Sequence, residues 1–153
     1  MPIDPLTPYL TAIEAQVYFD ERLNTECWDD SLEADQEKAL KQATRAIDKI
    51  NYRGAKTSST QERQFPRDSD TEVPQDVLEA VCEEALALLE GIDARQEFEN
   101  LGMVAQGIAN VRSTYNRESL PPHTLVGLVS SDAYMKLKPY IKDGKTFDIN
   151  RVS

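Results

Sequence analysis

The first part of the chain shows apolar side chains at helical spacing, interrupted by clear breaks. Thr11 and Glu14 have the form of a capping box, which predicts a helix of about three turns that ends near Asn24. A second helix is predicted to begin near Asp30 or Ser31. Its apolar side chains recur at spacings of three and four residues, which places one stripe on one face: Leu40, Ala43, Ile47 and Ile50.

A third helix is predicted from Pro74 to Gly91. Proline suits the first helical position because its missing N–H would have no partner there, and glycine suits the stop. The apolar stripe of this helix comprises Val77, Val81, Ala85 and Leu88, with Cys82 beside it as a small buried side chain. The glutamates are expected to cover the outer side of the helix: Glu79, Glu83, Glu84 and Glu90.

The last third of the chain is less regular. Residues 103–116 mix apolar and small side chains, which favours a short β-hairpin or an extended segment. Leu120-Pro121-Pro122 is expected to be extended, and a short helix follows from Ser131 or Asp132 to Pro139. We therefore predict a mainly α fold, a bundle of three to five helices, with one domain over residues 1–142 and a free tail over residues 143–153.

A long segment without a helical pattern, Tyr52 to Val73, separates the second and third helices. Loops beyond roughly 12–15 residues are uncommon in compact domains and are usually functional or disordered. This one carries Tyr52-Arg53-Gly54 and Phe65-Pro66-Arg67, so we expect an ordered surface element. Two compatible interpretations apply: Phe65 closes the core beneath the loop, or it acts with Arg67 as a docking anchor.

The polar part of this loop is the expected contact with a neighbouring subunit. The predicted interface residues are Lys56, Ser58, Ser59, Thr60, Arg63, Phe65 and Arg67. Replacing Phe65 with alanine should destabilise the monomer. Changes within residues 58–60 should spare folding and weaken assembly.

The charge is unevenly spread over a chain whose net charge is -10. Residues 1–30 hold seven acidic and one basic side chain, and residues 72–99 hold nine and one, whereas residues 31–71 hold seven acidic and eight basic side chains. The acidic stretches oppose tight non-specific binding of nucleic acid. Four cations of the second helix lie off its apolar stripe, either as a solvated face or as a surface for an acidic partner or nucleic acid: Lys38, Lys41, Arg45 and Lys49.

The residue types that carry catalysis or bind metals are sparse. His123 is the only histidine, and Cys27 and Cys82 have neither disulfide nor metal-site spacing. Acidic side chains follow a calcium-loop template from Asp68 to Glu79, but Val73 stands where that loop needs glycine. We therefore expect no enzyme, no cofactor, no metal and no membrane partner.

A set of short motifs, taken in order, carries a resemblance to a known family. The motifs are Tyr18-Phe19, Trp28, Ala43 to Asp48, Tyr52-Arg53-Gly54, Phe65-Pro66-Arg67, Val73-Pro74 and, more weakly, Ser131 to Tyr134 and Leu137 to Tyr140. The chain resembles phage proteins labelled DnaT-like single-stranded-DNA-binding, a group that overlaps with head-to-tail connector adaptors.

The resemblance implies a head-to-tail adaptor of the virion neck, present in the host cytoplasm before assembly. Such a protein forms a ring, typically of twelve copies, between the portal protein and the next connector or tail protein, and genomic DNA passes through it without specific binding. By position in the family, Phe147, Ile149 and Arg151 of the tail would dock on the portal. The alternative is a single-stranded-DNA-binding protein of the primosomal DnaT-like type.

Overall fold

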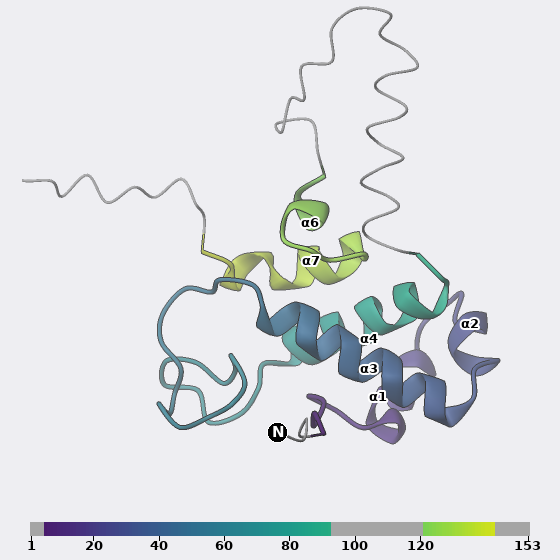
Figure 1. The fold of residues 1–153 in the computed structure, drawn as a ribbon, viewed down its shortest axis with the longest axis horizontal. Coiled ribbons are helices and arrows are strands. Elements are labelled where there is room, and N and C mark those ends of the chain that lie inside the picture. Colours follow the sequence, from purple (N-terminus) through teal and green to yellow (C-terminus); the bar gives the residue numbers. More distant parts are fainter. Residues whose placement is uncertain (1–4, 93–120, 143–153) are drawn as a thin grey trace, which may run out of the picture.

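A computed structural model describes residues 5–92 and 121–142, and these residues form a mainly helical architecture (Figure 1). The described α-helices are α1 Ala12–Phe19, α2 Glu26–Asp29, α3 Glu33–Asp48, α4 Gln75–Leu89, α6 Pro122–Leu125 and α7 Ser131–Leu137, which continues into the 3-10 helix Lys138–Tyr140. The predicted fold class is confirmed, although the short helices α2 and α6 were not foreseen. The predicted hairpin over residues 103–116 and the tail over residues 143–153 lie outside the described residues.

The N-terminal helix begins as its capping box predicts. The backbone N–H of Glu14 donates to Thr11 Oγ1 at 3.3 Å, and the backbone N–H of Thr11 donates to Glu14 Oε2 at 2.7 Å. The helix ends at Phe19, earlier than the predicted Asn24, and the chain then turns into α2. This turn brings Trp28 onto Phe19 with 4.4 Å between ring centroids, and the tryptophan is fully buried.

Helix α4 lies at the centre of the described fold. Helix α3 packs along it, α7 crosses it, and α1 and α2 contact its remaining side (Figure 1). A helix enclosed in this way is buried on nearly every face. Its buried residues are Val77, Ala80, Val81, Cys82, Glu83, Glu84, Ala85, Leu86 and Ala87.

The prediction that Glu83 and Glu84 cover an outer face of α4 is wrong, because other elements cover that face. Glu83 is 5% exposed and accepts hydrogen bonds from the hydroxyl of Tyr18 and from Arg22 Nε and Nη2, the latter two at 2.7 and 2.9 Å. Glu84 is 1% exposed and accepts the backbone N–H groups that precede α7. Buried carboxylates are tolerated when their oxygens are bonded in this way.

The segment from Tyr52 to Val73 is ordered, and its two aromatic-arginine motifs contact each other. Phe65 packs edge-on against Tyr52 and Tyr140, with centroid distances of 4.6 and 5.6 Å. The guanidinium of Arg67 donates to the carbonyl oxygens of Arg53 at 2.9 Å and Gly54 at 2.8 Å. Phe65 is 2% exposed, which confirms that it closes the core beneath the loop.

The contact between these two motifs requires a glycine at position 54. Its φ of +74° lies in the left-handed region, where side chains with a Cβ are strained. A Cβ at this position would also lie 2.2 Å from Asp68 Oδ1, which accepts the backbone N–H of Ala55 at 3.1 Å. The loop therefore closes only with glycine at this position.

The prediction of an extended Leu120-Pro121-Pro122 is wrong at its last residue. Pro121 is extended, with φ of -57° and ψ of 136°, but Pro122 is the first residue of α6. Proline fits the first helical turn because the backbone N–H that it lacks would have no acceptor within the helix at that position.

Replacing Phe65 with alanine should lower the free energy of unfolding by about 3–5 kcal/mol, the usual cost of truncating a buried phenylalanine. Urea unfolding followed by far-ultraviolet circular dichroism measures the change. The control Ser59→Ala alters an exposed side chain of the same loop and should shift stability by less than about 0.5 kcal/mol. Equal effects of the two changes would contradict the anchoring role of Phe65.

The two thiols should differ in reactivity. Burial raises the pKa of the Cys82 thiol to about 12, so the reactive thiolate is scarce at neutral pH. Cys27 is exposed. A chromogenic disulfide reagent at pH 8 should modify one thiol of the native protein rapidly and both thiols in denaturant, whereas rapid reaction of both thiols without denaturant would count against this packing of α4.

Candidate functional site

Helix α3 presents four cations along one face. Lys38, Lys41, Arg45 and Lys49 follow spacings of three and four residues, which places them on the same side of the helix. Lys49 is the C-terminal cap. The set, called the basic row below, spans roughly 16 Å at the helical rise per residue. The opposite side of α3 is buried through Leu40, Ala43 and Ile47, so core packing fixes the direction in which the basic row points.

Three cations of the basic row have no acidic partner in the part of the chain that the structure describes: Lys41, Arg45 and Lys49. Lys38 lies 3.2 Å from Asp35, but both side chains are exposed, and such pairs contribute little.

Other cations of the described residues are held by carboxylates. Arg22 pairs with Glu83, Arg63 with Asp48, and Lys136 with Glu79. Hydrogen bonds to their carboxylate partners raise the pKa of Arg22 and of Lys136, which keeps both groups charged. These pairs serve the fold, whereas Lys41, Arg45 and Lys49 of the basic row have no such carboxylate among the described residues.

Two further basic residues, Arg53 and Lys142, lie beyond the end of α3. The backbone N–H of Lys142 donates to the carbonyl oxygen of Asn51 at 3.0 Å, and that of Arg53 donates to Tyr140 at 2.8 Å. Arg53 and Lys142 are both exposed. Backbone pairing therefore brings a cation from the far end of the described chain next to the C-terminal end of the basic row.

The acid within this stretch, Asp48, is already engaged. Its carboxylate accepts hydrogen bonds from the hydroxyl of Tyr9, from Arg63 at 3.3 Å and from the backbone N–H of Gln64 at 3.2 Å. Burial and the bond to Asp48 raise the pKa of Tyr9. Asp48 thus links the N-terminal segment to the loop, and its charge is paired with that of Arg63.

The N-terminal half of α3 and the helices before it carry the opposite charge. Exposed carboxylates in this region are Glu14, Asp20, Glu21, Glu26, Asp29, Asp30, Glu33, Asp35 and Glu37. Along α3 the basic residues therefore begin at Lys38 and occupy the C-terminal part of the helix.

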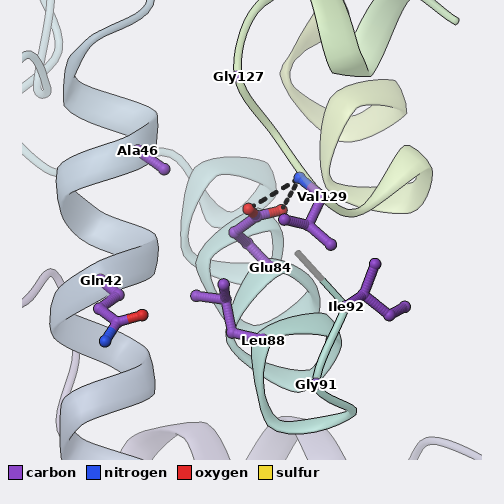
Figure 2. Close-up of a pocket in the computed structure, with 8 residues that line it drawn as sticks. All are labelled: Gln42, Ala46, Glu84, Leu88, Gly91, Ile92, Gly127 and Val129. Atoms are coloured by element: carbon purple, nitrogen blue, oxygen red, sulfur yellow. Dashed lines mark hydrogen bonds between the residues drawn. The ribbon is translucent and has the colours of Figure 1, made fainter. Parts of the chain in front are cut away.

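A shallow pocket of about 410 Å³ opens between α3, α4 and the chain that leads to α7 (Figure 2). Its walls are Gln42 and Ala46 of α3, Glu84 and Leu88 of α4, the following Gly91 and Ile92, and Gly127 with Val129. Gln42 lies four residues after Lys38 and three before Arg45, so it shares the face of the basic row. The pocket and the basic row are therefore neighbours.

The carboxylate of Glu84 forms part of the pocket wall and holds the wall together. It accepts the backbone N–H of Val129 at 2.9 Å and that of Ser130 at 2.9 Å, as Figure 2 shows for Val129. Ser130 is the N-cap of α7, and its hydroxyl oxygen accepts the N–H of Ala133 at 3.1 Å. Glu84 thus fixes the start of α7 against α4.

The predicted loop interface is only partly exposed. Ser58, Ser59 and Thr60 lie at the surface, and Lys56 is half-buried. Arg63 donates to the carbonyl oxygen of Thr7 and to Asp48, and Arg67 donates to carbonyls of its own loop, so both guanidinium groups bind this chain. The predicted tail residues Phe147, Ile149 and Arg151 lie outside the described residues.

The spacing of the cations predicts the basic row but not the pocket. Spacing alone allows two interpretations of the row, because it cannot show whether a cation has a partner from elsewhere in the fold. One signal for Glu84 lies in the sequence: together with Glu83 it interrupts an otherwise apolar run from Ala80 to Leu89, where a charged residue is buried only if paired.

Other site chemistry is not found in the described parts of the chain. No three His, Cys, Asp or Glu side chains of residues 5–92 and 121–142 are grouped to hold a metal ion, and none of the helices there has the length and apolar character to cross a membrane. The large apolar side chains exposed among these residues are aliphatic or methionine, not aromatic: Ile13, Val17, Leu23, Leu32, Leu125 and Met135.

Comparison with known proteins gives one family. The sequence model of the family described as "Putative DnaT-like ssDNA binding protein" matches residues 7–152. Searches of curated proteins and of solved structures return no match.

This match corrects the prediction of a head-to-tail adaptor. The family description names binding of single-stranded DNA and no component of a virion, so the adaptor prediction, with its neck and connector terms, is wrong. The match instead supports the alternative prediction, a single-stranded-DNA-binding protein of the DnaT-like type.

Glu84→Gln should lower the free energy of unfolding by about 2 kcal/mol, because a neutral amide is a weaker acceptor for two backbone N–H groups than a carboxylate. Urea unfolding measures the loss, and hydrogen exchange at Val129 and Ser130 should quicken. Glu90→Gln, at an exposed site on the end of α4, is the control. Equal stability of the two variants would show that Glu84 does not hold α7.

Proposed function

The chain belongs to the family of DnaT-like ssDNA binding proteins, and we propose that it binds single-stranded DNA through the basic row of α3. One observation carries the proposal: Lys41, Arg45 and Lys49 lie on one face of a rigid helix without acidic partners in the described chain.

Phosphates are the natural partners of such a row. Each lysine or arginine that meets a phosphate releases condensed counterions, which supplies most of the free energy of non-specific binding. The row is fixed by the burial of Leu40, Ala43 and Ile47 on the opposite side of α3, so the cations need little ordering beyond their own side chains. The exposed Lys142, whose backbone N–H is bonded to Asn51, can lengthen the surface by a further contact.

The surrounding charge favours a single strand over a duplex. A single strand is flexible and can follow a short row on one helix, whereas a duplex is stiff over about 150 base pairs. A rigid duplex laid along α3 would run into the carboxylates around Glu33 and Glu37 at the other end of the helix. The acidic end thus limits the strand to a short footprint.

Binding of this kind should depend strongly on salt and little on sequence. Proteins that bind single strands usually add stacking on exposed aromatics. In the described residues, Trp28, Phe19, Tyr52 and Phe65 are buried in the core, and no aromatic side chain is fully exposed: Tyr9, Tyr18, Tyr134 and Tyr140 are half-buried. Electrostatics therefore supplies most of the affinity that these residues offer.

The proposed role is binding rather than catalysis. The portal and tail partners, the twelve-copy ring and the virion location depended on the adaptor prediction and form no part of the proposal.

The triple variant Lys41→Gln/Arg45→Gln/Lys49→Gln should bind labelled oligothymidine at least about tenfold more weakly at low salt. The slope of log Kobs against log salt should flatten by about 2, since each lost phosphate contact removes about 0.7. Fluorescence anisotropy titrations between low and moderate salt give both quantities. Oligothymidine is used because it forms no stable secondary structure.

Two controls accompany this titration. Lys56→Gln removes one cation from the loop beyond α3 and should leave the affinity and the salt slope nearly unchanged. It is compared with Lys49→Gln, which removes one cation of the basic row and should lower both. Urea unfolding of the triple variant should match that of the unchanged protein, because the replaced side chains lie outside the core. An unchanged titration curve for a folded triple variant would refute the basic row as the binding surface.

A further inference from the structure

We infer that the pocket between α3, α4 and the chain before α7 receives one nucleobase of the bound strand. The inference rests on the proposed function, because the basic row must first hold the backbone beside the pocket. The pocket would add a contact to a base. The row alone does not provide this contact, since it binds phosphates, which are the same whatever the base.

The lining of the pocket favours a neutral group. Among the described residues no lysine or arginine lines it, and the carboxylate of Glu84 in its wall accepts two backbone N–H groups. A phosphate would meet no cation in this lining, whereas the neighbouring basic row attracts it. The strand therefore has one arrangement that suits both surfaces, with phosphates on α3 and a base turned toward α4.

The shape and lining of the pocket suit a flat, partly apolar ligand. Leu88, Ile92 and Val129 supply aliphatic walls, as Figure 2 shows. The volume of about 410 Å³ falls in the range of roughly 300–1,000 Å³ that small-molecule sites occupy. Gly91 and Gly127 also line the pocket, and a Cβ at either position would meet no atom within 4 Å.

Gln42 supplies the polar contact that a base requires. Its side chain lines the pocket from α3 (Figure 2), and an amide both donates and accepts hydrogen bonds, as base edges do. Gln42 shares its face of the helix with Lys38 and Arg45, so a base bonded to it would leave its own phosphate within reach of a cation.

The test compares two strands of equal length and charge, oligothymidine and an otherwise identical strand of abasic sites. The full chain should bind oligothymidine about fivefold or more tightly than the abasic strand at the same salt, because only the former can fill the pocket. Both titrations should share the same salt slope, since the phosphates are the same.

Two variants then locate the difference. Ala46→Leu fills the pocket from α3, and Gln42→Ala removes the amide without changing charge. Each should bring the ratio of the two affinities, oligothymidine over abasic strand, toward one. The affinity for the abasic strand should stay unchanged. The matched control Ala34→Leu makes the first substitution at an exposed site of the same helix and should preserve the preference. If Ala46→Leu does not fold, Gln42→Ala decides.

The outcomes separate this inference from the proposed function. Equal, salt-dependent affinity of the unchanged protein for both strands would overturn the base pocket and leave the basic row intact. Failure to bind either strand at low salt would overturn both. A preference that survives in Gln42→Ala and in folded Ala46→Leu would place the base elsewhere and also overturn the pocket.

Discussion

The adjacent carboxylates of Glu83 and Glu84 on α4 are the interaction on which the described fold depends. The two side chains serve different neighbours: Glu83 holds α1 through Tyr18 and Arg22, and Glu84 holds the start of α7 through backbone N–H groups. A buried carboxylate without partners is strongly destabilising, so each neighbour must be in place for the central helix to be stable. The aliphatic packing around them is less directional and could not fix these positions alone.

This use of carboxylates explains how a chain of net charge -10 presents a positive surface. Several acids lie inside the fold or beside its structural cations, as Glu83 does with Arg22 and Asp48 with Arg63. Many of the remaining acids gather around α1, α2 and the start of α3. The C-terminal part of α3 is left with cations only, apart from the engaged Asp48. Net charge therefore says little about which partner such a surface selects.

The helical stripes and the capping box follow from local spacing, which is why α1, α3, α4 and α7 could be predicted from sequence. The burial of Glu83 and Glu84 could not, because it depends on α1 and α7 arriving from distant parts of the chain. The contacts that join Gly54 to Arg67 and Asp68 also depend on residues more than ten positions apart, so spacing could not predict them, although the sequence shows both motifs. The four cations of α3 were also visible, but only the fold shows that three of them lack a described acidic partner.

The most direct test of the account is to map the DNA contact by nuclear magnetic resonance. Backbone amide shifts of the isotopically labelled protein would be followed while short oligothymidine is added at low salt. The largest shifts should fall on Lys41 to Lys49 and the adjoining Arg53 and Lys142, with α1 and α2 unaffected. Shifts concentrated on the loop tip at residues 58–60 or on α1, with none on α3, would contradict this prediction.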